Sequence, residues 1–597
     1  MPQGRRKTPF SGKAKKEQLK AKRERRQGEN KVPLLQRPGG DNESESSSSV
    51  RKLNYQPTKG HGSKPNRYAL QFFSESNEEI KQMKEFSRQV LVPVEEKDLE
   101  IEASDFFEDA LDFPKRPAWN FNLSKEQLEA QENRYFHEYL NKIEVNYDLK
   151  DLSYFELNLE TWRQLWRVLE LSDIILFIVD VRFSATMFPP LLYTYVTKDL
   201  GKDFILVLNK IDLVPASLVV AWKHYFQQHY PLLKVCMFTS IPSYNLVSQK
   251  ADKGGLQIRR RKGRLHMAAE GTQKLFDVCQ SLVGDKVNLT TWQNKIKSEM
   301  HEDIENDEKV EIGETLHQQN ETGFYQYEKF KGGILTVGCI GQPNVGKSSL
   351  MNAIMGKKVV SISKTPGHTK HFQTIFLTPQ VRLCDCPGLV FPSKVPKPLQ
   401  VLMGSFPIAQ LREPYSTIRF LAERLDLIKM LRIEHPYNDN TWSPMDICDG
   451  WAKKRVYLTA RAARLDTYRA ANSILRMALD GKICLCLRPI GYLKEKEYWE
   501  KHVGVNEVRW IKAFSQEEGD GEFVPETNNS ESSDEEVKNE DSDEDQNVKS
   551  ETENTSSSED EDDVISSNKF ALLGGANKLK DSHQRLHHTY HKSSLYI

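Results

Sequence analysis

A glycine-rich run of nine residues has the residue types and spacing that bind phosphate groups. It reads Gly341-Gln-Pro-Asn-Val-Gly-Lys-Ser-Ser349, with an apolar strand-like stretch before it and a helix-like stretch after it. Glycines in this pattern let backbone N–H groups wrap a phosphate, and the start of the following helix adds positive potential. We expect Lys347 to reach the β- and γ-phosphates of a nucleotide and the Ser348 hydroxyl to bind Mg²⁺.

A second run, Asn209-Lys-Ile-Asp212, predicts which base the site selects. The Asp212 carboxylate can accept hydrogen bonds from N1 and the exocyclic amine of guanine. Adenine lacks this pair of donors and would leave the carboxylate buried and unpaired, which disfavours an ATPase or a kinase. Thr239-Ser240 ends the next strand-like stretch and is a candidate for supporting the base, although an ordinary strand end would look the same.

The run Asp385-Cys-Pro-Gly388 is significant because of its position. It lies at the end of a strand-like stretch about forty residues after the phosphate loop. There Asp385 would hold Mg²⁺ through a water molecule, and the Gly388 N–H would contact the γ-phosphate. Between the two motifs, Thr365-Pro-Gly-His-Thr369 offers a threonine to the metal. We favour Thr369, with Thr365 as the alternative.

Two residues bear on the rate of hydrolysis. Leu389 follows Gly388, where Ras-type GTPases place a glutamine that orients the attacking water. Leucine cannot bind water, so intrinsic hydrolysis should be slow unless another group or a partner does this work. The side-chain carbonyl of Asn344 could coordinate K⁺ beside the phosphates; the alternative is that Asn344 only stabilises the loop. The predicted catalytic residues are Lys347, Thr369, Asp385, Gly388 and Asn344.

The predicted nucleotide contacts all lie in these motifs. They are Asn209, Lys210, Asp212, Ser240, Gly341, Gln342, Pro343, Asn344, Val345, Gly346, Lys347, Ser348, Ser349, Asp385, Cys386, Pro387 and Gly388. In an ordinary GTPase the phosphate loop precedes the guanine-reading motif, whereas here it follows about 130 residues later. This order predicts a circularly permuted domain, in which a γ-phosphate contact at Gly388 would pull directly on residues 391–500.

Continuous apolar runs predict the strands of the fold. Residues 173–180, 203–208, 235–240 and 334–340 have the composition of strands buried on both faces, as in a parallel sheet. A helix is predicted over 347–355, and further strands over 372–377 and 381–385. A three- and four-residue spacing of apolar side chains predicts a helix face at Trp162, Leu165, Trp166 and Leu169. The fold class is therefore α/β, a mostly parallel sheet flanked by helices.

Composition divides the chain into five parts. We expect a basic, Ser-rich disordered tail (1–60), a helical region (61–160), a GTP-binding domain (161–398) with a polar insertion and acidic linker at about 245–325, a helical C-terminal domain (399–512) with an amphipathic run over 458–479, and an acidic, Ser-rich disordered tail (513–597). The net charge of +0 hides this segregation, with a basic run in the first 26 residues and acidic residues over 517–563. The charge of the basic N-terminal segment (the basic head) favours binding to RNA, and the charge of the acidic C-terminal segment (the acidic tail) favours binding to basic proteins. The alternative is that both are solvated tails without fixed partners.

The eight cysteines include two Cys-x-Cys pairs, at 384/386 and 484/486, inside apolar runs and without the spacing of zinc or redox motifs. We interpret them as buried free thiols of a reducing compartment. Neither a signal peptide nor a run of about 18 apolar residues is apparent, so we expect a soluble, intracellular protein without a membrane partner.

The motif order NKID, GQPNVGKSS, PGHT and DCPG resembles the circularly permuted GTPases of the ribosome-assembly group, over roughly residues 160–500. Asp180-Val-Arg182 resembles that group's DAR signature, with valine replacing alanine. The resemblance implies GTP binding with Mg²⁺, a hydrophobic residue at position 389, and action on pre-ribosomal particles, usually of the large subunit. It also implies a nuclear or nucleolar location, with shuttling to the cytoplasm as a further expectation. The alternative function is a GTP-gated scaffold that does not hydrolyse GTP.

Overall fold

A computed structural model describes residues 53–54, 70–73, 75–120, 122–240, 244–245, 259–260, 264–301, 328–357, 359–360, 373–459 and 463–508. The predicted basic head, the acidic tail and the run Thr365 to Thr369 lie outside these residues. Within them, no helix is long and apolar enough to cross a membrane.

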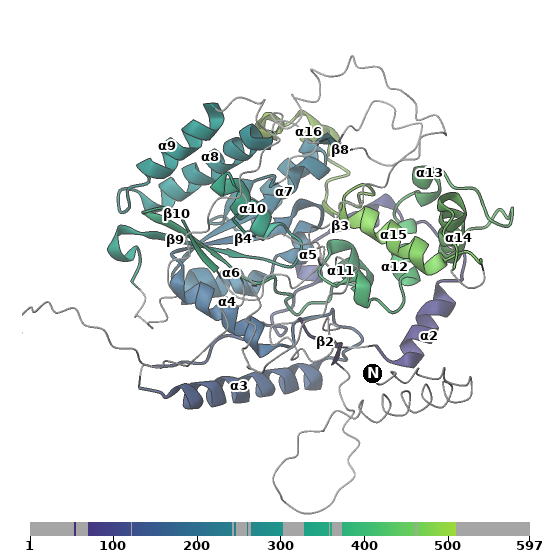
Figure 1. The fold of residues 1–597 in the computed structure, drawn as a ribbon, viewed down its shortest axis with the longest axis horizontal. Coiled ribbons are helices and arrows are strands. Elements are labelled where there is room, and N and C mark those ends of the chain that lie inside the picture. The colour runs from purple at the N-terminus through teal and green to yellow at the C-terminus, as the bar shows by residue number, and fades with distance from the viewer. Residues whose placement is uncertain are drawn as a thin grey trace, which may run out of the picture. The chain divides into compact units, whose positions relative to one another are not determined.

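A six-stranded sheet forms the centre of the fold (Figure 1). Its strands are β4 (Ile174–Asp180), β5 (Asp203–Asn209), β6 (Lys234–Met237), β9 (Leu335–Ile340), β10 (Gln373–Thr378) and β11 (Val381–Asp385). Their order across the sheet is β10-β11-β9-β4-β5-β6, and every neighbouring pair is parallel except β10 with β11. The predicted strands are therefore present, and the predicted mostly parallel α/β sheet is confirmed.

The pairing of β4 with β9 joins the two separated parts of the sequence. Ile174 pairs with Val337, and Phe177 pairs with Ile340. All residues of both strands are buried, as their continuous apolar composition predicts. Because parallel strands end at one edge of a sheet, the pairing brings the residues after β4, β5, β9 and β11 to the same edge.

Helices flank the sheet. They are α4 (Leu159–Leu171), α7 (Ala216–His229), α8 (Arg264–Val283), α9 (Thr290–His301) and α10 (Lys347–Met355). The predicted apolar face of α4 is buried, and this helix packs against β9. Helix α8 packs against β6, α9 and α10, and it buries Leu275, Phe276 and Cys279. Residues 264–301, which fall within the range predicted as insertion and linker, thus contribute to the core.

A second group of helices follows the last strand. It comprises α11 (Lys397–Met403), α12 (Tyr415–Ala422), α13 (Leu427–Leu431), α14 (Pro444–Arg455) and α15 (Thr467–Leu479). The amphipathic run predicted over 458–479 is helical only from Thr467. The Asp466 side chain accepts a hydrogen bond from the Arg469 N–H and so begins α15 there, while Leu458 and Leu465 pair as an antiparallel bridge.

Residues after α15 pack against elements that precede the second helix group in the sequence. β12 (Arg488–Pro489) pairs in parallel with β3 (Glu100–Ile101), and α16 (Lys496–Lys501) packs against α7. On the N-terminal side lie α2 (Asn77–Phe86) and α3 (Lys125–Asn146), and α2 packs against α12. Besides short 3-10 and π-helical turns, the remaining strands and α-helices of the described residues are β1 (Leu53–Asn54), β2 (Phe72–Phe73), α5 (Ser184–Met187), α6 (Pro190–Thr194), β7 (Tyr244–Asn245) and β8 (Arg259–Arg260).

Candidate nucleotide-binding site

The phosphate loop lies between β9 and α10 and depends on two glycines. Gly341 has φ 155° and Gly346 has φ 100°. A Cβ atom at Gly341 would lie 2.4 Å from the Ile178 carbonyl oxygen, and one at Gly346 would lie 2.4 Å from Asn209 Nδ2. Neither atom can retreat freely, because one is backbone of β4 and the other is hydrogen-bonded. Glycine is therefore required for backbone conformation and for close approach.

Lys347 opens α10 and is buried, with its ammonium turned into the loop. Its Nζ donates to the carbonyl oxygens of Gly341 (3.0 Å) and Gln342 (2.7 Å). Burial lowers the pKa of Lys347, and the nearby Asp385 opposes that change. The loop thus holds the ammonium beside the backbone that is predicted to wrap the phosphates.

Asp385 ends β11 beside the start of α10. Ser348 Oγ donates to Asp385 Oδ2 at 3.0 Å, whereas Asp385 Oδ1 is buried with no hydrogen-bond partner among the described residues. Burial raises the pKa of Asp385 to about 6. A carboxylate oxygen without a partner next to a serine hydroxyl is a hard oxygen donor set, which fits Mg²⁺. Ser348 and Asp385 would hold the ion; Thr369 and Thr365 lie outside the described residues.

Asn209, the first residue of the predicted guanine-reading motif, is hydrogen-bonded to the phosphate loop. Its Nδ2 donates to the Val345 carbonyl oxygen at 2.7 Å, and its Oδ1 accepts from Ser240 N (3.2 Å) and Ser240 Oγ (3.0 Å). Asp212 is buried, and its Oδ1 accepts from Thr239 Oγ1 at 2.9 Å. The structure therefore brings together the predicted guanine-reading motif, Thr239-Ser240 and the phosphate loop. The strand predicted over residues 235–240 ends at Met237, so Thr239 and Ser240 follow β6 and do not end it.

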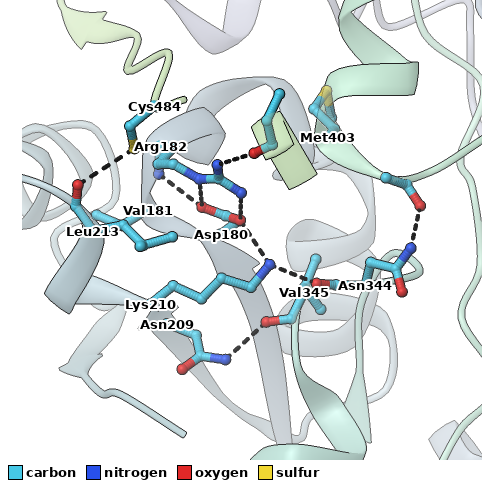
Figure 2. A network of polar contacts seen from close by, with 12 residues as sticks. Asp180, Val181, Arg182, Asn209, Lys210, Leu213, Asn344, Val345, Met403 and Cys484 are labelled. Carbon is cyan, nitrogen blue, oxygen red and sulfur yellow. Dashed lines mark hydrogen bonds and ion pairs between the residues drawn. The ribbon is translucent and has the colours of Figure 1, made fainter. Parts of the chain in front are cut away.

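Lys210 connects the phosphate loop to a buried ion pair (Figure 2). Its Nζ donates to the Asn344 carbonyl oxygen at 2.7 Å and lies 2.9 Å from Asp180 Oδ2. Asp180 also accepts from Arg182 Nε (3.0 Å) and Nη2 (2.8 Å). Burial favours the neutral acid, but Arg182 and Lys210 hold the pKa of Asp180 well below its usual range. The Asp180-Val-Arg182 signature is thus the support that positions Lys210.

The segment after Asp385 lies against the phosphate loop. A Cβ on Gly388 would lie 2.8 Å from Pro343 Cα, so only glycine allows this approach. Leu389 N donates to the Gly341 carbonyl oxygen at 3.3 Å, while the Leu389 side chain is fully buried in the hydrophobic core. Its side chain therefore contributes to packing and cannot position a water molecule.

Two contacts to the second helix group were not predicted. Asn344 Nδ2 donates to the Gly404 carbonyl oxygen at 2.9 Å, and Ser405 Oγ donates to Gln342 Oε1 at 2.6 Å. Gly404 is the C-cap of α11 and has φ 78°. Neither Gly404 nor Ser405 belongs to a recognisable motif, so these contacts follow only from the packing of α11 next to the loop.

Comparison with known proteins agrees with this geometry. A family model described as "50S ribosome-binding GTPase" matches residues 336–431. "Guanine nucleotide-binding protein-like 1" of Rattus norvegicus is 45% identical over 539 residues, which cover 84% of this chain and 88% of the rat protein. The Homo sapiens protein of the same name is 46% identical over 540 residues, with the same coverage. The chain belongs to the guanine nucleotide-binding protein-like 1 family.

Other matches cover less of this chain. "Large subunit GTPase 1 homolog" of Mus musculus is 30% identical over 439 residues, or 63% of this chain and 66% of that protein. The solved structure of GNP-bound YlqF from T. maritima matches with 16% identity and a TM-score of 0.31, covering 54% of this chain and 95% of the YlqF chain. The predicted resemblance to this GTPase group is confirmed by the family membership.

Proposed function

We propose that the chain binds GTP with Mg²⁺, hydrolyses it slowly, and acts as a nucleotide switch in the assembly of the large ribosomal subunit. The hydrogen bond from Asn209 Nδ2 to the Val345 carbonyl oxygen carries the proposal, because it joins a guanine-reading motif to a phosphate loop. The printed names of the relatives, guanine nucleotide-binding and large-subunit GTPase, support the same reading, as does the 50S ribosome-binding description of the family model.

The buried groups of the site suggest how each would act. Lys347 would exchange the carbonyl oxygens of Gly341 and Gln342 for the β- and γ-phosphates. Ser348 would bind Mg²⁺ directly and Asp385 through water, with Thr369 as the proposed third ligand. The ion would neutralise charge that develops on the phosphates during transfer. Gly388 N–H would contact the γ-phosphate at the start of the segment that leads to α11.

The slow rate rests on Leu389, whose buried side chain leaves the place of the usual glutamine without a polar group. The rival proposal is a scaffold that binds GTP without hydrolysing it. Phosphate release over several turnovers, with and without purified pre-ribosomal RNA particles, separates the two. A slow rate that the particles raise supports the switch. Release no greater than that of Lys347→Ala under both conditions supports the scaffold.

K⁺ is proposed as an additional ion at Asn344. Asn344 has φ 59°, and its Nδ2 is held by the Gly404 carbonyl oxygen. Its amide oxygen is the atom that would meet K⁺ near the phosphates, where a cation offsets charge as an arginine finger does. Turnover in matched potassium and sodium buffers tests this. A potassium preference that Asn344→Ala removes supports the ion site; a wild type indifferent to the cation leaves Asn344 only a loop-stabilising role.

The partners are proposed from the tails, and the location from the resemblance to ribosome-assembly GTPases. The basic head would bind ribosomal RNA through phosphates, so its affinity should fall steeply with salt. The acidic tail would bind basic ribosomal proteins, and the protein would concentrate in the nucleolus and shuttle to the cytoplasm. Deletion of residues 1–30 should flatten the salt dependence and reduce nucleolar accumulation. Unchanged accumulation would move the targeting segment elsewhere, for which residues 259–264 are the next candidate.

A further inference from the structure

Two cysteines differ from the other six in this chain. Cys484 and Cys486 are partly exposed, whereas the remaining six are buried. Their Sγ atoms lie 3.7 Å apart. Burial raises the pKa of the other thiols, as for Cys236, where the pKa is about 12, and buried neutral thiols react slowly with oxidants. The pair 484/486 is thus the place where thiol chemistry can occur.

The surroundings lower the pKa of one member of the pair. A hydrogen bond from Cys486 and the guanidinium of Arg182 lower the pKa of Cys484, against the effect of burial. The same hydrogen bond raises the pKa of Cys486, so the two thiols are unequal. An activated thiol beside a second thiol is the arrangement of a thiolate that attacks an oxidant and a neighbour that resolves the product.

The pair also touches the guanine-reading motif. Cys484 Sγ donates to the Leu213 carbonyl oxygen at 3.4 Å, and Leu213 directly follows Asp212 (Figure 2). One residue beyond Cys486, the Leu487 N–H donates to the Arg182 carbonyl oxygen at 2.9 Å. The stretch 484–487 therefore lies against both the base reader and the arginine that holds Asp180.

We propose that Cys484 and Cys486 form a reversible disulfide in the presence of hydrogen peroxide, and that this modification weakens guanine nucleotide binding. The Cys484 thiolate attacks one peroxide oxygen, which breaks the O–O bond and gives a sulfenic acid and, after protonation, water. The Cys486 thiol then attacks the Cys484 sulfur, forms the S–S bond and releases a second water. Two thiols and one peroxide thus give one disulfide and two waters. Two equivalents of a thiol reductant reverse the reaction.

The disulfide would affect nucleotide binding because Cys484 loses the S–H that donates to Leu213. A disulfide draws the sulfurs from 3.7 Å to about 2.0 Å and removes the S–H that Leu213 accepts from. The backbone beside Asp212 then loses a fixed contact. We expect GTP affinity to fall about two- to tenfold, the range that corresponds to one hydrogen bond. This part rests on the proposed GTP binding, whereas formation of the disulfide does not.

The test uses the full chain, reduced and then treated with stoichiometric hydrogen peroxide. Free thiols are blocked, and peptide mass spectrometry identifies any 484–486 disulfide. GTP affinity is measured by titration with a fluorescent analogue before oxidation, after oxidation and after reduction. Cys484→Ser is the matched control, because its hydroxyl can still donate to Leu213 but cannot form the disulfide. In Cys486→Ser, a dimedone adduct at Cys484 reports the sulfenic acid.

The expected result is a 484–486 disulfide in the wild type, a two- to tenfold loss of GTP affinity that reductant restores, and no loss in Cys484→Ser. The proposal is overturned if the disulfide does not form, if it forms with GTP affinity unchanged, or if Cys484→Ser loses affinity as the wild type does. Failure of the reduced wild type to bind GTP would instead count against the proposed function, and the disulfide result would still stand by itself.

Discussion

The base side and the phosphate side of the proposed nucleotide site both contain buried polar side chains, but the hydrogen bonds of these side chains differ. On the base side, both polar atoms of the Asn209 amide are hydrogen-bonded, and Asp212 accepts from Thr239. On the phosphate side, Asp385 keeps one buried oxygen without a partner among the described residues, and Lys347 donates to two carbonyl oxygens of its own loop.

The base side is therefore preorganised by contacts within the protein, whereas the phosphate side presents charges for a ligand to match. On the base side, Asn209 and Asp212 are held by hydrogen bonds within the protein, so these contacts should contribute to the stability of the fold. The phosphate side holds an ammonium and a carboxylate whose strongest partners are phosphates and a divalent cation, because an ammonium is attracted more strongly to an anionic acceptor than to a neutral carbonyl. Substitutions on the phosphate side should therefore change binding more than stability, and those on the base side should change both.

The largest effect is expected from Lys347→Ala and Ser348→Ala. Each should lower Mg²⁺-dependent affinity for a fluorescent GTP analogue by about a thousandfold, because Lys347 is the proposed charged partner of the phosphates and the Ser348 hydroxyl is the proposed ligand of the metal. Thermal unfolding should change little. The exposed Lys357→Ala serves as the control. Wild-type affinity in either variant would show that the phosphates bind elsewhere.

Asp212→Asn should lower GTP affinity by about a hundredfold, the effect of losing charged hydrogen bonds to the base. Xanthosine triphosphate should bind better to this variant than to the wild type, because the donor and acceptor pattern is inverted. Competition titrations with both nucleotides measure the change, with the exposed Asp199→Asn as control. If selectivity for guanine survives, Asp212 does not read the base.

Asn209→Ala should reduce both binding and stability. The substitution leaves the Val345 carbonyl and Ser240 without their buried partner, which should cost about 2–3 kcal/mol of unfolding free energy. Urea denaturation without nucleotide measures it, against the exposed Asn506→Ala. A loss of affinity with unchanged stability would contradict the preorganised base side.

Glu156→Gln tests whether a buried carboxyl group with one unpaired oxygen affects nucleotide binding when it lies outside the proposed site. Like Asp385, Glu156 has one buried oxygen without a partner among the described residues, but it lies between Gln71 and Val390. Burial raises its pKa from 4.5 to about 8. The folded protein keeps a proton that the unfolded chain loses above about pH 4.5, so stability should fall as pH rises from there to about 8.

The variant remains neutral and should therefore be more stable than the wild type by roughly 4 kcal/mol at pH 8 and about equal at pH 4.5, since the pKa rises from 4.5 to about 8 and one pKa unit is about 1.4 kcal/mol. Urea denaturation at both pH values measures this, with the exposed Glu138→Gln as control. GTP affinity should not change. Reduced affinity would mean that the segment after Gly388 is coupled to Glu156, and the contrast with Asp385 would disappear.

Much of this arrangement could be predicted from the sequence, because each strand of the sheet is a continuous apolar run and each motif follows a strand. The start of α15 could not, since the cap at Asp466 outweighed an apolar spacing that begins earlier. The contacts of Gly404 and Ser405 with the phosphate loop depend on tertiary packing and have no motif. The role of Asp180 and Arg182 in positioning Lys210 could not be predicted, because it depends on the tertiary contact between Lys210 and Asp180.

The pairing of β4 with β9 has a consequence for the chain as it is synthesised. Strand β4 is complete at Asp180, but its partner β9 begins only at Leu335, roughly 150 residues later. At a translation rate of about 5–20 residues per second, β4 waits roughly 8–30 s with one edge unpaired. An open edge on an apolar strand is a template for aggregation. The permuted order therefore makes the nascent chain dependent on shielding, by a chaperone or by its own transient contacts, until β9 emerges.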